Sequence, residues 1–156
     1  MKSNLNKSRF SFNKPEESPG FLLWQVTNLW QKQIIVRLKL RRLTHVQFVV
    51  LATAHWLSMS SKQVSQSQIA AQTKIDPMVI SNTIKALEKE GLVRRFPHQG
   101  DTRAKNVEIT SVGTKALAAA LTEVEDIDRK FFKILNKRIG TLNSQLVALI
   151  QKNSSP

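Results

Sequence analysis

The stretch SQSQIAAQTKIDPMVISNTIKALEKEG, residues 65–91, carries the signals that decide the fold. Its opening residues Ser65-Gln-Ser-Gln68 have the spacing of a capping box, in which each end residue's side chain bonds the other's backbone N–H; they predict a short helix. Asp76-Pro77 then supplies an N-cap residue and a proline at the first helical position, which predicts a second helix ending at Gly91. Only Lys74-Ile75 separates the two helices, the spacing of a helix-turn-helix.

A basic hairpin follows this pair of helices directly. Leu92–Phe96 and Ala104–Ile109 fit two strands, and turn-forming residues from Pro97 to Gly100 predict the connection between them. Basic residues stand on both arms: Arg94, Arg95, Arg103 and Lys105. A further helix is predicted ahead of the pair, because Thr44-His-Val-Gln47 repeats the capping box. The order of three helices and a hairpin predicts a mainly α fold with a small β-hairpin wing, a winged helix-turn-helix.

The second helix of the pair divides into two faces. One face is expected to pack inward through Val79, Ile80, Ile84 and Leu87. The opposite face, expected to enter a major groove of DNA, carries Pro77, Met78, Ser81, Asn82 and Lys85. Asn82 can bind adenine with two hydrogen bonds, and Ser81 and Lys85 can bind a base or a phosphate. The alternative is the solvated side of an ordinary amphipathic helix. The basic hairpin that follows favours DNA, and its Arg94, Arg95, Arg103 and Lys105 are expected to bind it.

Long apolar helices are predicted on both sides of this module. The helix from Gly20 to Leu40 is apolar over so much of its circumference that one neighbour would not cover it. A long helix is expected to run from Ser111 to Gly140, and Thr141 is expected to cap a last one. We therefore interpret 19–42 and 111–153 as dimerisation helices, 43–110 as the DNA-binding module and 1–18 as a flexible basic arm.

The charge balance indicates a polyanionic partner. The 156 residues include 24 Lys and Arg against 11 Asp and Glu, a net charge of +13, which favours nucleic acid or an anionic membrane surface. No apolar run approaches the roughly eighteen residues that a membrane span needs, and no signal peptide is recognised, so a cytoplasmic location is expected. One dense basic cluster, which could contact phosphates or form a solvated helix end, comprises Arg37, Lys39, Arg41 and Arg42.

Catalytic and metal chemistry find little support. The chain has no cysteine, which excludes disulfides, thiolate nucleophiles and cysteine zinc sites. His45, His55 and His98 are far apart in the sequence, and no phosphate-binding glycine loop or nucleophile elbow is present. The acidic residues Glu123, Glu125, Asp126 and Asp128 are expected to be a solvated helix face, with metal binding the minor alternative. We expect no enzymatic activity, no cofactor and no metal.

Residues 43–115 resemble the MarR family of bacterial transcriptional regulators. The resemblance is carried in order by Leu43-Thr-x-x-Gln-Phe48, Gln68-Ile-Ala70, Leu87-Glu-Lys-Glu-Gly-Leu-Val-Arg94, Asp101-Thr-Arg-Ala-Lys105, Ile109-Thr110 and Gly113. It implies a homodimer, joined through its N- and C-terminal helices, that binds double-stranded DNA at a pseudo-palindromic operator, as a repressor or other regulator. A winged-helix module that binds other proteins is the alternative, because fold alone does not determine function.

The resemblance also assigns roles within the wing. It places Arg103 in the DNA minor groove with Asp101 holding it, and makes Lys105 a phosphate contact. The chain departs from the family's pattern in two places. The segment Ser58–Val64 is a few residues longer, which is expected to extend the loop and leave the motif intact. Asn82 stands where an arginine is frequent, which puts an inherited operator preference in doubt.

A small aromatic effector is the remaining implication of the resemblance. Many family members bind such a ligand between the dimerisation helices and the DNA-binding module. The residues that could line that site here are Trp24, Trp30, His45 and Trp56. The alternative is that the tryptophans belong to the core, as buried tryptophans more often do.

Overall fold

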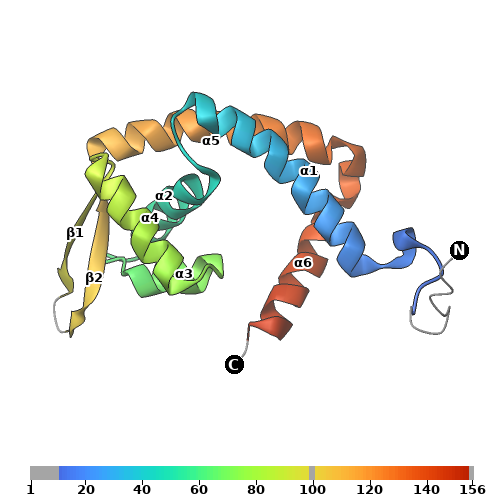
Figure 1. The fold of residues 1–156 in the computed structure, drawn as a ribbon, viewed down its shortest axis with the longest axis horizontal. Helices are drawn as coiled ribbons and strands as arrows, with labels where there is room; N and C mark the ends of the chain where they lie inside the picture. The colour runs from blue at the N-terminus through green and yellow to red at the C-terminus, as the bar shows by residue number, and fades with distance from the viewer. Residues whose placement is uncertain (1–10, 99–100, 155–156) are drawn as a thin grey trace, which may run out of the picture.

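The computed structural model describes residues 11–98 and 101–154, with the backbone alone at 98 and 101–104. Residues 1–10 of the predicted arm lie outside the described part, and η2 (Pro15–Glu17) forms a single 3-10 turn within the rest of it. Figure 1 shows an arch in which a helical module with a two-stranded wing stands at one end and a long helix leads from it to the other end.

The module consists of three helices and the hairpin. They are α2 (His45–Ser58), α3 (Gln66–Thr73), α4 (Pro77–Lys89), β1 (Val93–His98) and β2 (Asp101–Ile109). Both predicted capping boxes are confirmed. At the start of α2 the side chains of Thr44 and Gln47 each accept the other's backbone N–H, and at the start of α3 those of Ser65 and Gln68 do the same. At the start of α4 the Asp76 carboxylate accepts the Met78 N–H at 2.8 Å, as its sequence predicts.

The inward face of α4 differs from the prediction at one residue. Ile80, Ile84 and Leu87 are fully buried in the core, as expected. Val79 was expected beside them and is 44% exposed. The buried positions follow a spacing of four and three residues, and Val79 lies one residue before the first of them, on the margin that faces solvent.

The hairpin is longer than predicted. β1 continues through Pro97 and His98, so the predicted connection from Pro97 to Gly100 is too long, and residues 99–100 lie outside the described part. The strands are antiparallel, and Arg95 pairs with Val107 and Pro97 with Lys105. The register shifts between Pro97 and His98, where proline has no N–H to give to the ladder.

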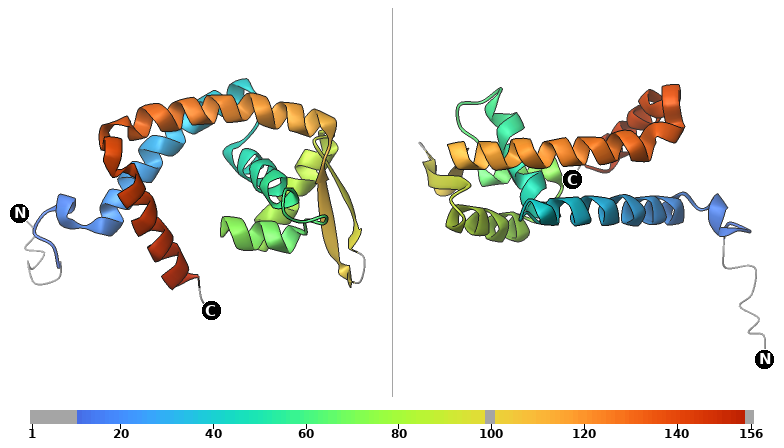
Figure 2. Two further views of the ribbon diagram at one scale, coloured as in Figure 1. Left: turned by 180° about the vertical axis from the view of Figure 1, so that it is seen from behind. Right: turned by 90° about the horizontal axis from the view of Figure 1, so that it is seen from above.

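Two long helices form the top of the arch. α1 (Pro19–Leu40) packs along α5 (Ser111–Phe131), and Figure 2 shows them running side by side. No helix in the described ranges is both long enough and apolar enough to cross a membrane.

α5 ends earlier than predicted, and the last helix, α6, also begins earlier. α5 ends at Phe131, followed by the 3-10 segment η3 (Phe132–Arg138) and then α6 (Ile139–Asn153). The expected break at Gly140 and cap at Thr141 are therefore wrong, since both residues lie in the first turn of α6. The chain leaves the helical conformation at Asn136, whose φ of 47° and ψ of −126° mark the kink between the two segments.

The junction between the wing and α5 depends on Gly113. Thr110 donates its hydroxyl proton to the Gly91 carbonyl at 2.7 Å, and its hydroxyl oxygen accepts the Gly113 N–H at 3.0 Å. A Cβ added at Gly113 would lie 2.0 Å from the Leu92 carbonyl oxygen and 2.8 Å from Ile109 Cγ2. This position has room only for glycine, so the strand end can approach the first turn of α5.

Candidate nucleic-acid interface

One face of α4 points away from the core. Pro77, Met78, Asn82 and Lys85 are exposed and Ser81 is half-buried, so all five predicted residues of this face are accessible. Met78 is 72% exposed, so its side chain is available on this face. The buried side of the helix holds this face outward.

A groove of about 950 Å³ joins this face to the wing. It runs between α3, the start of α4 and the two strands. Its polar lining includes Lys74, Ser81, Lys85, Arg95 and Lys105. Ser81 and Lys85 come from α4. Arg95 and Lys105 lie on one face of the hairpin, because Arg95 pairs with Val107 and Lys105 is two residues from Val107. The groove thus brings together residues that were predicted separately from the helix and from the wing.

The Arg95 side chain is held by Glu88 of α4. The Arg95 Nε–H donates to one Glu88 carboxylate oxygen at 2.7 Å, the Arg95 backbone N–H donates to the other at 3.1 Å, and Nη2 is ion-paired with the same carboxylate. The hydrogen bond from Arg95 lowers the pKa of Glu88 below its ordinary value, and the charges of Arg95 and Lys105 add to this. Sequence reasoning missed Glu88, which is only a charged residue near the end of a helix until the hairpin folds back on it.

Arg94 lies on the other face of the hairpin. It forms a cross-strand ion pair with Glu108 at 3.2 Å, and both side chains are largely exposed. It is not among the described residues that line the groove. The structure therefore separates Arg94 from Arg95, although both were predicted as one basic group.

On either side of the undescribed residues 99–100, His98 and residues 101–104 are described by their backbone alone. Asp101 and Arg103 belong to β2, but their side chains lie outside the described part of the structure. Their predicted pairing therefore stays a prediction.

The segment Ser58–Val64, which leaves the end of α2, packs against the wing. The Val107 N–H donates to the Val64 carbonyl at 2.8 Å, and the buried Asn106 donates its amide to Gln63 Oε1 at 3.1 Å. The capping box at Ser65 is intact, as predicted for this departure from the family pattern. The loop holds the hairpin on the side away from α4.

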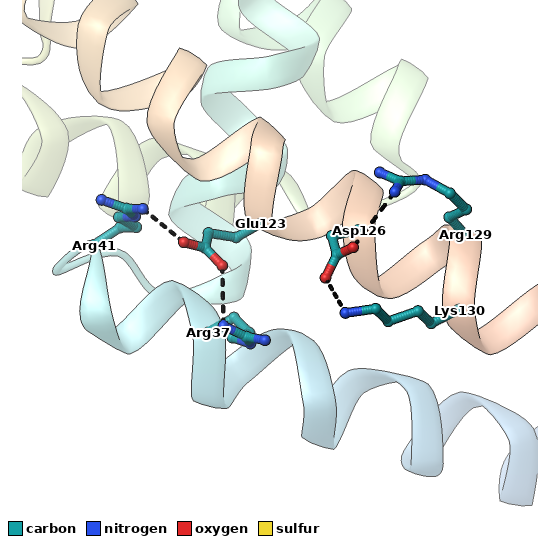
Figure 3. Close-up of polar contacts among 6 residues, drawn as sticks. All are labelled: Arg37, Arg41, Glu123, Asp126, Arg129 and Lys130. Carbon is teal, nitrogen blue, oxygen red and sulfur yellow. Dashed lines mark hydrogen bonds and ion pairs between the residues drawn. The ribbon is translucent and has the colours of Figure 1, made fainter.

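The basic cluster at the end of α1 is partly neutralised within the chain. Arg37 and Arg41 both bind the Glu123 carboxylate of α5, at 3.3 Å and 2.6 Å, and Glu123 is only 18% exposed (Figure 3). This ties α1 to α5 and makes these two arginines poor candidates for phosphate contacts. Lys39 and Arg42 are exposed.

The acidic residues of α5 have separate partners. Asp126 binds Lys130 at 2.6 Å and Arg129 at 3.5 Å (Figure 3), and the hydrogen bond from Lys130 lowers the pKa of Asp126. Asp128 accepts the indole N–H of Trp30 at 2.7 Å. Within the described residues, no group of three or more His, Asp or Glu side chains is arranged to hold a metal ion.

Of the four residues predicted for an effector site, the structure brings together two. Trp30 and His45 meet edge to face, with ring centroids 5.3 Å apart, beside Asp128. Trp24 and Trp56 are 67% and 65% exposed and belong to other surfaces of α1 and α2. Asp128 was expected on a solvated face of its helix; it is half-buried and bonds Trp30 of α1 instead.

Burial lowers the pKa of the His45 imidazole below its ordinary value of 6.5, and the charge of Asp128 opposes this shift only in part. The folded protein therefore favours neutral His45, and the unfolded chain binds the proton first as the pH falls. We expect the free energy of unfolding to decrease as the pH falls from about 6.5 through the lower pKa of the folded state. Part of this decrease should disappear in His45→Gln.

Urea unfolding at about pH 7.5 and about pH 5.5 measures the effect, because the carboxylates with lowered pKa values titrate below this window. His55→Gln, at an exposed position of the same helix, is the matched control and should keep the full decrease. An equal decrease in the parent protein and His45→Gln would contradict the assignment.

These elements and this groove define a winged helix-turn-helix protein. The family model described as MarR family matches residues 43–105. A curated relative, the uncharacterised HTH-type transcriptional regulator YdcH of Bacillus subtilis (strain 168), is 36% identical over 132 residues, which cover 85% of this chain and 90% of the relative. The chain belongs to the MarR family of transcriptional regulators.

Solved structures share the fold. A mutant MarR from E. coli in complex with operator DNA superposes with a TM-score of 0.76 at 21% identity, covering 90% of this chain and 99% of that one. Bordetella bronchiseptica BpsR, whose DNA binding is regulated by 6-hydroxynicotinic acid, superposes with a TM-score of 0.73 at 23% identity, covering 90% and 96%.

Proposed function

We propose that the protein is a homodimeric, sequence-specific DNA-binding regulator that represses transcription from a pseudo-palindromic operator. The observation that carries the proposal is the groove in which Ser81 and Lys85 of α4 face Arg95 and Lys105 of the wing. Phosphates fix a protein on the duplex and base edges supply specificity, and this groove offers groups suited to both. The operator-bound MarR of the same fold supports this assignment.

The proposed contacts fall into two classes. Base edges in the major groove are assigned to the exposed face of α4, with Asn82 as the principal reading residue. Backbone and minor-groove contacts are assigned to the wing, where Arg103 enters the minor groove and Asp101 restrains it. In a symmetric dimer the two α4 helices would enter successive major grooves about 34–36 Å apart.

Asn82→Ala and Arg103→Ala should reduce DNA binding in different ways. On a duplex selected from random DNA by the parent protein, Asn82→Ala should cost about 1–3 kcal/mol and change binding to shuffled duplexes little. Arg103→Ala should weaken binding to both duplexes and reduce the salt dependence by about one unit of slope. Fluorescence anisotropy over a salt series measures both effects.

Asn153→Ala, at an exposed asparagine near the end of α6, is the control and should bind like the parent. Unchanged binding by Arg103→Ala would rule out a DNA-binding wing. A protein-docking module, the second candidate function, would bind the duplexes weakly or not at all, whatever the salt concentration.

The apolar surfaces of α1 and α6 support the proposed dimer. The exposed large side chains on these helices include Leu23, Leu29, Val36, Leu40, Val147, Leu149 and Ile150. Extensive exposed apolar surface on a protein commonly marks an interaction site. A second copy of the chain is the partner that this family implies.

Unfolding of an obligate dimer depends on protein concentration. We expect the thermal midpoint to rise with concentration and sedimentation to give the mass of two chains. Leu149→Glu should shift the mass toward the monomer, because it places a charge in the proposed interface. Val112→Glu, at an exposed apolar residue of α5 beside the wing, is the matched control and should leave the dimer intact. A monomer mass with a concentration-independent midpoint would contradict the proposal.

We further propose that a small aromatic ligand bound at the Trp30–His45 pair releases the DNA. The pair lies where α1, α2 and α5 meet, and Asp128 offers an acceptor for a ligand hydroxyl or N–H. The regulation of BpsR by 6-hydroxynicotinic acid supports this class of effector.

Aromatic acids that carry a ring hydroxyl, beginning with 6-hydroxynicotinic acid, serve as probes. We expect one of them to displace the selected duplex from the parent protein and from Trp56→Ala, the exposed control, but not from Trp30→Ala. Displacement that is equal in all three proteins would exclude the Trp30 site.

A further inference from the structure

The ion pair between Glu88 and Arg95 lies at the rim of the groove. Arg95 lines the groove and Glu88, among the residues that the structure describes, does not. The carboxylate engages Nε and Nη2 of the guanidinium together with the Arg95 backbone N–H, so one side chain of α4 fixes both the backbone and the side chain of β1. The direction of the guanidinium is thereby set by the helix that faces the DNA.

Glu88 leaves part of Arg95 available. A guanidinium has five N–H donors, and the carboxylate binds through the Nε and Nη2 edge, so Nη1 is not engaged by Glu88. Lys105 lies on the same face of the hairpin and lines the same groove. Two cations from neighbouring strands thus stand together beside α4.

Stability alone is a weak reason for this pair. The side chains of Arg95 and Glu88 are 22% and 33% exposed, and ion pairs that water reaches contribute little to folding. A carboxylate close to a surface that binds a polyanion also reduces the attraction for DNA. An acid at this place is favourable for binding if it orients a cation that would otherwise move freely.

We propose that Glu88 is a positioning residue for DNA backbone recognition: it holds Arg95 so that the outer N–H groups of the guanidinium and Lys105 bind one phosphate beside the groove that α4 enters. The inference rests on the proposed function and assigns to Glu88 a role in the fit to one particular duplex. It acts through Arg95 and does not itself touch the DNA.

The hairpin supplies a matched control on its opposite face. Arg94 and Glu108 form an ion pair of the same chemistry, at 3.2 Å, away from the groove. Glu88→Gln and Glu108→Gln both remove one negative charge from the hairpin region and keep the side-chain size. A difference between them therefore reports the place of the acid and not the net charge of the protein.

The experiment measures the affinity of full-length protein for the selected duplex and for a shuffled duplex of the same length. Glu88→Gln should weaken binding to the selected duplex by about five- to tenfold and leave binding to the shuffled duplex equal or slightly tighter, since a freed arginine still attracts phosphates. Glu108→Gln should leave the ratio of the two affinities unchanged. The exchange Glu88→Arg with Arg95→Glu restores an ion pair but removes the cation from the strand, and it should not recover the ratio.

Five results would overturn the inference. A ratio unchanged in Glu88→Gln shows that Arg95 needs no positioning, and an equal loss in Glu108→Gln shows a general effect of charge. Recovery of the ratio by the exchanged pair would show that the ion pair only stabilises the fold. An equal loss of affinity on both duplexes, with a lower thermal midpoint, would show the same. A parent protein that prefers no duplex would overturn the proposed function and this inference with it, which distinguishes the two failures.

Discussion

The contact between the Leu92 carbonyl and the first turn of α5 is the constraint on which the arrangement of the module depends. Because Gly113 has no side chain, the strand that leaves α4 and the helix that follows β2 approach within contact distance. Thr110 then bonds the Gly91 carbonyl and caps α5 with the same hydroxyl. The start of β1 and the end of β2 are therefore joined to the first turn of α5, and the Glu88–Arg95 pair holds β1 against α4.

The parts of the fold that the sequence predicts are those with local causes. An N-cap residue and its partner lie three positions apart, so Thr44, Ser65 and Asp76 mark helix starts without knowledge of the rest of the chain. The end of α5 has no such signal. It is set by a kink at Asn136, and the glycine at 140 that looked like a terminator is an ordinary helical residue. The prediction that Val79 is buried was wrong for a related reason, because burial at the margin of a helix face depends on which neighbours reach it.

In the candidate site, too, the features with local causes were predicted and those that depend on distant residues were not. Helical periodicity placed Ser81, Asn82 and Lys85 on one accessible face, and the structure agrees. The partners of long charged side chains were not predictable, because Glu88, Glu108 and Glu123 each meet an arginine from another element. These pairings decide which cations face the groove. Arg95 and Lys105 do, whereas Arg37 and Arg41 are occupied between α1 and α5.

The helix α5 connects the two halves of the molecule through contacts of different kinds. Its first turn receives the end of the wing at Gly113, and farther along it binds α1 through Glu123 and then through Asp128, which accepts the indole N–H of Trp30. Trp30 in turn meets His45 at the start of α2. One continuous helix of 21 residues therefore carries the anchor of the wing and the acceptor beside the aromatic pair. The wing of the proposed DNA-binding face and the proposed effector site are therefore joined through this helix.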